Sequence, residues 1–218
     1  VEEEKKYGKE IYLQIANSVA INNDPYISLY LQDIKNRLEE VTSIPFPITL
    51  TVIQSQTVNA FATIGGYIYL TTGLIAFSDT EEELAGVLAH ELAHITRRHV
   101  AKRVEKEKYI NIGMLATMLA GMLVGGDPKA KEAVIMGSQA AAQALSLKYS
   151  RDDEDEADRS GSIYSDRAGY NAVGVANFLK KLRVTGRETT IPQYLLTHPY
   201  HEERIIKLEN AWPDSKTT

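Results

Sequence analysis

Two histidines and a glutamate form the pattern in this sequence that is best suited to catalysis. The run H-E-L-A-H places His90 and His94 four residues apart. In a helix such residues lie one turn apart on the same face, with Cβ atoms about 6 Å apart, so both imidazoles can point a nitrogen at one metal ion. Glu91 lies about 100° further round the helix, where it can act as a general base on metal-bound water without being a ligand. The pattern predicts a hydrolytic metal site.

A zinc ion in such a site needs a third protein ligand and an open position. Because the chain contains no cysteine, that ligand must be histidine, aspartate or glutamate. His99 fails on geometry, since in one continuous helix it falls on the opposite side from His90. Arg97 and Val100 also stand where the metzincin pattern requires glycine and histidine. We expect His99 to be a structural residue near the helix end, in a basic stretch that complements the helix dipole.

The acidic run over residues 152–158 supplies better candidates for the third ligand. Such a run is ordinarily a solvated face, but this one opens a predicted helix and has Glu154 and Asp158 four residues apart on one face. One carboxylate can bind the metal while another accepts a hydrogen bond from a ligand histidine and fixes its tautomer. Spacing alone does not choose Glu154 over Asp155 or Glu156.

The elements that must position these residues indicate an α+β fold, mainly helical, in a single domain over residues 1–218. Two helices are expected within residues 1–43, a small sheet within 44–79 and a helical catalytic part over 80–218. The sheet is predicted to contain three antiparallel strands, the last two joined by a two-residue Gly-Gly turn at 65–66.

Most of the chain after Thr80 is predicted to be helical. A helix over residues 80–106 carries both histidines of the motif, and its leucines face away from them, which would anchor the helix in a core. Ser150 and Asp153 form a capping-box pattern that opens another helix. Further helices are expected over residues 130–149, 171–183 and 201–211.

The segment 110–126 is apolar on all sides and carries Met114, Met118 and Met122 on one helical face. Its length falls short of the about 20 apolar residues that a span of the bilayer needs. The pattern favours a buried helix or hairpin arm. The alternative is a helix that contacts lipid or another protein, because methionine-rich faces adapt to varied partners.

The charge balance argues against a nucleic-acid partner. Lysine plus arginine total 24 against 29 acidic residues, a formal charge of −5, which leaves no basic excess to neutralise a phosphate backbone. A hydrophobic fraction of 44% is ordinary for a globular protein and excludes a disordered chain. The first residues lack the apolar core of a signal peptide, so the protein is expected either to be cytosolic or to have lost a leader.

The H-E-L-A-H motif and the run from Tyr149 to Asp158 together resemble the family of zinc metallopeptidases that contains the integral-membrane prenyl-protein protease, HtpX and BepA (YfgC). The signature of that family pairs H-E-x-x-H with S-R-x-x-E-x-x-A-D, and its soluble BepA-like branch fits this chain best. The resemblance covers residues 45–210 and extends to the segments 59–62, 65–74 and 197–199 and to Arg204.

The resemblance implies a gluzincin-like fold with one zinc ion per chain. His90, His94 and Glu154 would be the zinc ligands. Glu91 would be the general base, and Asp158 would be the carboxylate that accepts a hydrogen bond from a ligand histidine.

The same resemblance implies how a substrate would bind. Asn59, Ala60, Phe61 and Ala62 would form an edge strand that pairs with an extended peptide through backbone hydrogen bonds. The substrate would be an unfolded or membrane-associated polypeptide. The location would be periplasmic or membrane-associated, and residues 110–126 would contact the membrane surface or the outer-membrane assembly machinery.

His198, which precedes a proline, is assigned to the catalytic site with two alternative roles. It could stabilise the tetrahedral oxyanion, or it could occupy the fourth position of zinc and keep the enzyme inactive until substrate binds. An ordinary loop histidine would do neither. Arg204 could pair with a site carboxylate or bind a substrate carbonyl.

The expected function is therefore that of a zinc-dependent endopeptidase. One alternative is a latent or inactive protease that acts as a chaperone-like polypeptide-binding module. A purely structural metal site is disfavoured, because Glu91 would have no purpose there and such sites normally fill all four positions with protein ligands.

Overall fold

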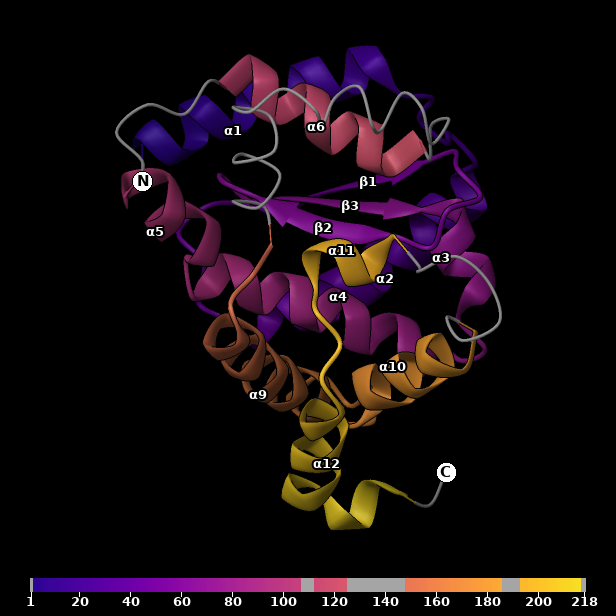
Figure 1. The fold of residues 1–218 in the computed structure, drawn as a ribbon. Helices are drawn as coiled ribbons and strands as arrows, with labels where there is room; N and C mark the ends of the chain where they lie inside the picture. Colours follow the sequence, from indigo (N-terminus) through magenta and orange to yellow (C-terminus); the bar gives the residue numbers. More distant parts are fainter. Residues whose placement is uncertain (1, 107–111, 125–147, 186–192, 217–218) are drawn as a thin grey trace.

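A three-stranded sheet held between helices forms the centre of the computed structural model (Figure 1). The structure describes residues 2–106, 112–124, 148–185 and 193–216. The strands are β1 (Thr49–Ile53), β2 (Ala60–Thr63) and β3 (Tyr67–Thr71). The helices are α1 (Glu2–Ser18), α2 (Pro25–Glu40), α3 (Thr72–Phe77), α4 (Glu81–Thr96), α5 (His99–Lys106), α6 (Ile112–Val124), α9 (Arg151–Arg167), α10 (Gly174–Thr185), α11 (Tyr194–Thr197) and α12 (Glu202–Ala211), followed by a 3₁₀ turn over Pro213–Lys216.

The sheet is mixed, with strand order β1-β3-β2, which corrects the prediction of three antiparallel strands. β2 and β3 form the predicted antiparallel hairpin, whose turn has φ angles of 84° at Gly65 and 89° at Gly66, a conformation that glycine adopts without steric cost. β1 instead pairs with β3 in parallel. After β1, the chain crosses to the opposite edge of the sheet and forms β2 there. The hairpin then brings β3 back between β1 and β2, so β2 is an outer strand.

The two faces of the sheet are buried in separate apolar clusters, since successive side chains of a strand point to opposite faces. Ala60 and Ala62 pack with Leu88 of α4 in one cluster. Phe61 and Tyr69 pack in the other cluster, against α1 and α6. Figure 1 shows α1 and α6 over one face of the sheet and α4 across the other. The motif helix is therefore packed directly against the sheet.

α4 carries the H-E-L-A-H motif through the interior. Thr80 caps its N-terminus by accepting a hydrogen bond from the backbone N–H of Glu83, as Ser and Thr commonly do at this position. The side chains of Leu84, Leu88 and Leu92 lie in the apolar cluster, which confirms the prediction that they anchor the helix.

α9 brings the acidic run alongside α4. The predicted capping box is present, with Ser150 and Asp153 bonded reciprocally at the helix start. Gly161 permits the close approach of the two helices, because a Cβ at this position would lie 3.0 Å from the backbone nitrogen of His90. The acidic residues of the first turns of α9 consequently reach the motif histidines.

The helix predicted over residues 80–106 is in fact two helices, α4 and α5. Arg98 between them adopts a left-handed conformation with φ of 58°, and its guanidinium is held 2.8 Å from a carboxylate oxygen of Glu4. The break turns the chain so that His99 lies against His94. The expectation that His99 faces away from the motif is therefore wrong.

α6 lies against α1 and covers the sheet. Leu115, Leu119 and Leu123 are buried in the cluster that contains Ile11 and Ile15 of α1. This burial confirms the buried-helix interpretation for the described part of the predicted segment, residues 112–124.

Of the helices that the structure describes, none is both long and apolar enough to span a bilayer. The helix predicted over residues 130–149 lies outside the described residues except for Lys148 and Tyr149, which are not helical.

Candidate active site

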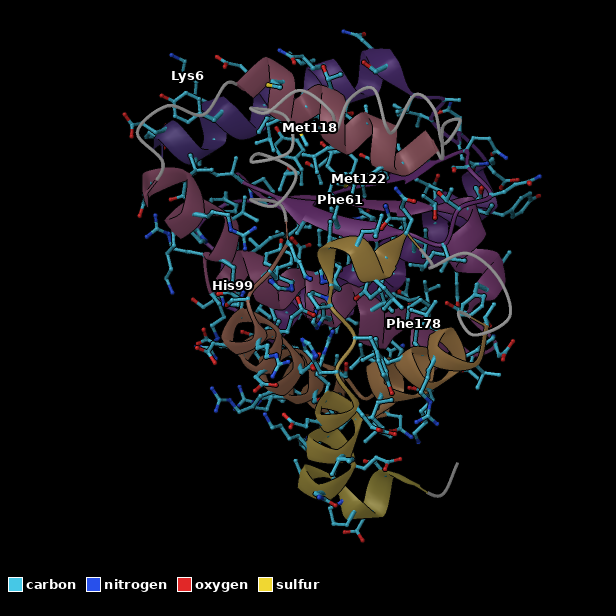
Figure 2. The ribbon with its side chains drawn as sticks, in the orientation of Figure 1. Lys6, Phe61, His99, Met118, Met122 and Phe178 are labelled. Atoms are coloured by element: carbon cyan, nitrogen blue, oxygen red, sulfur yellow. The ribbon has the colours of Figure 1, made fainter. Side chains whose placement is uncertain are left out.

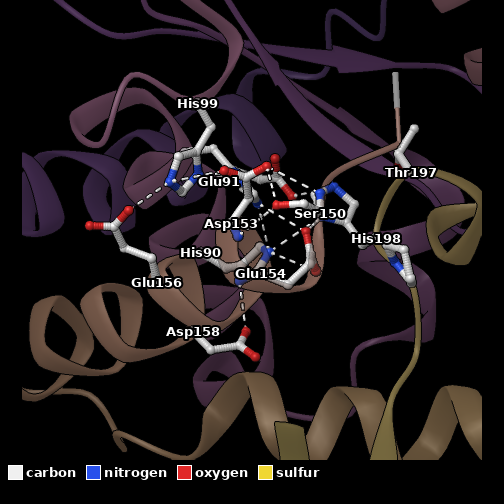
Figure 3. A network of polar contacts seen from close by, with 12 residues as sticks. His90, Glu91, His99, Ser150, Asp153, Glu154, Glu156, Asp158, Thr197 and His198 are labelled. Carbon is white, nitrogen blue, oxygen red and sulfur yellow. Dashed lines mark hydrogen bonds and ion pairs between the residues drawn. The ribbon is translucent and has the colours of Figure 1, made fainter. Parts of the chain in front are cut away.

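Four buried side chains from three parts of the chain converge at one point (Figure 3). His90 and His94 come from α4, Glu154 from α9 and His198 from the segment that follows α11. One ligand atom from each residue lies within 4.8 Å of the ligand atoms of the others. The Nε2 atoms of His90 and His94 are 3.0 Å apart, and the Nε2 atom of His94 is 3.4 Å from Glu154 Oε1.

The tautomer of His90 is fixed by Asp158. The Nδ1 atom of His90 lies 2.9 Å from Asp158 Oδ1, and the negative carboxylate favours the tautomer that carries its proton on Nδ1 and its lone pair on Nε2. Burial alone would raise the pKa of Asp158, but the adjacent Arg204 guanidinium lowers it to about 2. Asp158 therefore remains an ionised acceptor.

The tautomer of His94 is fixed by a longer relay. His99 lies with its Nε2 atom 3.1 Å from Glu156 Oε2 and its Nδ1 atom 2.8 Å from the Nδ1 atom of His94. If His99 donates to the carboxylate through Nε2–H, its Nδ1 atom accepts Nδ1–H of His94, which leaves the lone pair of His94 on Nε2. Tyr149 stacks on His94 with ring centroids 3.7 Å apart and holds the plane of the imidazole.

These tautomers make the cluster fit a metal cation. The lone pairs of His90 and His94 on Nε2 face each other across 3.0 Å, and the Glu154 carboxylate faces both. Burial would raise the pKa of Glu154, but Arg204 and His198 hold it well below its usual value, so this carboxylate is also ionised. Such a set of converging acceptors repels itself unless a cation lies between its members.

Glu91 lies beside the cluster and does not belong to it. Its carboxylate is fully buried, with Oε1 at 3.3 Å from the Nε2 atom of His198. Burial raises the pKa of Glu91, against the lowering effect of His198, His90 and the backbone N–H of Ala62. A carboxylate with a raised pKa next to a metal site is suited to accept a proton.

Arg204 holds the two α9 carboxylates together. It is 1% exposed, its Nε and Nη2 atoms donate to Asp158 at 2.6 and 2.7 Å, and its Nη1 atom contacts both Glu154 and the Pro199 carbonyl. Of the two alternatives, pairing with a site carboxylate is the one that the structure contains. Binding of a substrate carbonyl by Arg204 stays a prediction.

The segment 59–62 includes the outer strand of the sheet. The Asn59 carbonyl accepts the backbone N–H of Thr71, so in the antiparallel alternation the backbone groups of Ala60 and Ala62 point away from β3. The Asn59 amide donates to the Met122 carbonyl of α6, which ties the strand to that helix. The backbone groups of Ala60 and Ala62 are therefore outside the β2–β3 ladder.

Three side chains at the site were not assigned to it from the sequence. His99 was placed elsewhere because the break at Arg98 carries no glycine or proline signal. Tyr149 stands within the run that carries the resemblance, but nothing in its spacing indicates a stack on His94. Tyr194 stacks on His198, with ring centroids 4.4 Å apart, and its phenol lies far from the motif in sequence.

A metalloprotease is the class of protein that this fold and site define, and comparison with known families agrees. The family model of Peptidase family M48 matches residues 27–211. The chain therefore belongs to Peptidase family M48.

Curated relatives support the same assignment. The chain is 32% identical to the beta-barrel assembly-enhancing protease of Yersinia pestis, over 96% of this chain and 44% of that protein. It is 31% identical to the protein of the same name from Escherichia coli (strain K12), over 95% of this chain and 43% of that protein. It is also similar to a protease HtpX homolog of Desulfatibacillum aliphaticivorans, at 28% identity over 96% of this chain and 76% of that protein. The chain spans less than half the length of the first two relatives.

The relay through His99 leads to a prediction about metal affinity. His99→Ala removes the acceptor of His94 Nδ1–H, so we expect Zn²⁺ to bind about 10- to 100-fold more weakly. His99→Asn places an amide oxygen near the position of the imidazole Nδ1 atom and should restore most of the affinity. The measurement is competition for Zn²⁺ with a chromophoric chelator. His201→Ala, at the start of α12 outside the cluster, is the control, and equal losses in both alanine variants would contradict the relay.

Proposed function

We propose that the chain is a zinc-dependent endopeptidase that hydrolyses unfolded or membrane-associated polypeptides. The observation that carries the proposal is the arrangement of His90, His94 and Glu154 around one point, with the buried carboxylate of Glu91 beside it and outside the ligand set. A purely structural metal site would not require the carboxyl group of Glu91 in addition to that of Glu154. The membership of Peptidase family M48 supports the same reaction.

Different residues of the chain would bind zinc, transfer the proton and orient the ligands during peptide hydrolysis. A zinc ion held by His90, His94 and Glu154 would supply a Lewis acid that polarises the scissile carbonyl and makes water a nucleophile near neutral pH. Glu91 accepts the proton of the attacking water and returns it to the amine of the leaving group. Asp158 and His99 hold the imidazoles of His90 and His94 in the tautomers that leave Nε2 free.

The substrate is proposed to bind along β2. The outward backbone groups of Ala60 and Ala62 are the donors and acceptors that an added strand needs. Pairing through the backbone requires an extended segment, so flexible or unfolded polypeptides fit this surface.

His198 is proposed to act as a latch on the site. Its Nδ1 atom lies 3.1 Å from Glu154 Oε1 and 3.3 Å from the Nε2 atom of His90, so it stands among the ligand atoms. Its other nitrogen faces the general base, Glu91. An imidazole in this position would occupy the fourth coordination position of zinc and would block the access of water to Glu91. A residue that stabilises the oxyanion would leave both places free.

The latch leads to an expected result for His198→Ala. Removal of the imidazole should open the fourth position, so the zinc-loaded variant should cleave an unfolded protein such as casein several-fold faster than the native chain. The measurement is the initial rate of peptide release at matched zinc occupancy. A variant slower than the native chain would contradict the latch and favour the oxyanion role.

A chaperone-like, latent protease is the second candidate function. The position of the segment that carries His198 favours this second function. The backbone N–H of Tyr194 donates to the carbonyl of Val58, next to β2, so the segment covers part of the edge of that strand. Turnover separates the two functions. If the zinc-loaded His198→Ala variant binds casein without cutting it, the chain is a binding module.

The location and partners are proposed from the relatives alone. Two of them are named as proteases that enhance beta-barrel assembly, and we propose a role in the periplasm at the outer-membrane assembly machinery. The exposed side of α6, within the segment 110–126, is the proposed contact with that machinery or with the membrane surface.

A further inference from the structure

A small apolar cavity lies beside the edge of β2. Its volume is about 50 Å³. Its apolar walls come from four elements, α1, β2, α5 and α6, through the side chains of Ile11, Phe61, Val100, Val104, Leu115 and Leu119. Figure 2 shows Phe61 on β2, in the region between the sheet and α6. The cavity therefore lies on the α1–α6 face of the sheet, and the metal cluster lies beside α4.

The cavity adjoins the candidate catalytic groups. Its wall includes Tyr149, whose ring stacks on His94, and Thr197, the residue before His198. The backbone N–H of Tyr149 donates to the Thr197 carbonyl at 3.0 Å. Tyr149 therefore connects the wall of the cavity to His94, a proposed metal ligand.

The register of an added strand determines which substrate side chain enters. In a substrate strand that bonds to the outward groups of Ala60 and Ala62, one residue lies opposite Phe61 and the residue two positions away from it lies opposite Thr63. Directly opposed residues of paired strands point to the same face of a sheet. The side chain opposite Phe61 or Thr63 therefore points to the face that contains the cavity.

We propose that this cavity is a specificity pocket that takes a small aliphatic side chain, alanine or valine, from a residue next to the scissile bond. The inference rests on the proposed peptidase function. The volume limits the size of the side chain, because a cavity that binds benzene has a volume of about 150 Å³ and this one has about 50 Å³. Among the described residues, the lining contains no acidic side chain, so a lysine or arginine side chain would enter the cavity without a counter-charge.

The first test maps the cleavage sites. The zinc-loaded native chain is incubated with casein, and the product ends are identified by mass spectrometry. Alanine or valine should be enriched at one position next to the cut, with phenylalanine and lysine depleted. Equal use of all residue types at both neighbouring positions would overturn the proposal.

The second test changes the size of the pocket. Peptides built around one mapped site carry alanine, valine, leucine or phenylalanine at the selected position, and kcat/KM is measured for each. The native chain should prefer valine over phenylalanine by about tenfold or more, the range that pocket fit provides. Leu119→Ala should reverse or abolish this preference, because the wall recedes. Leu123→Ala should retain it, because Leu123 lies one turn along α6 and is also buried but does not line the cavity.

Binding separates failure of the pocket from failure of the peptidase. The same peptides are titrated against the zinc-loaded Glu91→Gln chain, and Kd is measured by fluorescence anisotropy. If the native chain cuts no peptide, the proposed function fails, but a valine preference in Kd that Leu119→Ala abolishes still supports the pocket. An unchanged preference in Leu119→Ala, in Kd and in kcat/KM, overturns the pocket whatever the rate of cleavage.

Discussion

Replacing Glu91 with glutamine is expected to reduce peptide cleavage by a factor of about 10²–10⁴ and to leave one zinc ion bound per chain. Glutamine preserves the shape of the side chain but cannot accept the proton of the attacking water. The ligand set of His90, His94 and Glu154 is untouched, so zinc content should not change. The measurements are the initial rate of casein cleavage and the zinc content of the dialysed protein by elemental analysis.

The control for this variant is Glu81→Gln. Glu81 lies on the same helix, α4, but in its exposed first turn beside Arg37, so its loss should change neither quantity. Cleavage by Glu91→Gln at the native rate would show that the general base is another group. Loss of zinc from Glu91→Gln would place Glu91 among the ligands.

Replacing Arg204 with methionine is expected to lower the free energy of unfolding by about 3–5 kcal/mol, the usual effect of removing one member of a buried charge network. Methionine retains the apolar length of the side chain and removes the charge. The carboxylates of Glu154 and Asp158, both buried, would then face each other without their common cation. The measurement is urea denaturation in the presence of a chelator, so that zinc does not replace the lost charge.

Arg183→Met is the matched control. Arg183 pairs with Glu202 at 2.9 Å, but the glutamate side chain is 67% exposed, and exposed pairs contribute at most about 1 kcal/mol. Similar losses of stability in the two variants would contradict the buried network. Zinc should restore part of the stability of the Arg204 variant, because a cation beside Glu154 relieves the same repulsion.

The sequence was most informative where local patterns are strong. The capping box at Ser150, the Gly-Gly hairpin turn and the leucine face of α4 all appear as predicted. The parallel pairing of β1 with β3 was not predicted, because strand order is a tertiary choice that the alternation within a strand does not encode. The break at Arg98 was missed for a similar reason, since the ion pair with Glu4 comes from a distant helix.

The candidate site shows the same division between local and distant signals. The spacing of H-E-x-x-H predicts that His90 and His94 share a face, and α4 places them so. Spacing could not choose among the acidic residues of α9, whereas the structure directs Glu154 to the histidines, Asp158 to His90 and Glu156 to His99. Gly161 permits the close approach of α9 to α4, and this approach determines which acidic residue of α9 reaches which histidine.

Anomalous diffraction at the zinc edge from crystals of metal-replete protein tests the account most directly. We expect one zinc peak per chain, within about 2.0–2.2 Å of the Nε2 atoms of His90 and His94 and of a Glu154 carboxylate oxygen. A map with no peak between these three side chains, from protein saturated with zinc, would contradict the metal centre and with it the proposed hydrolysis.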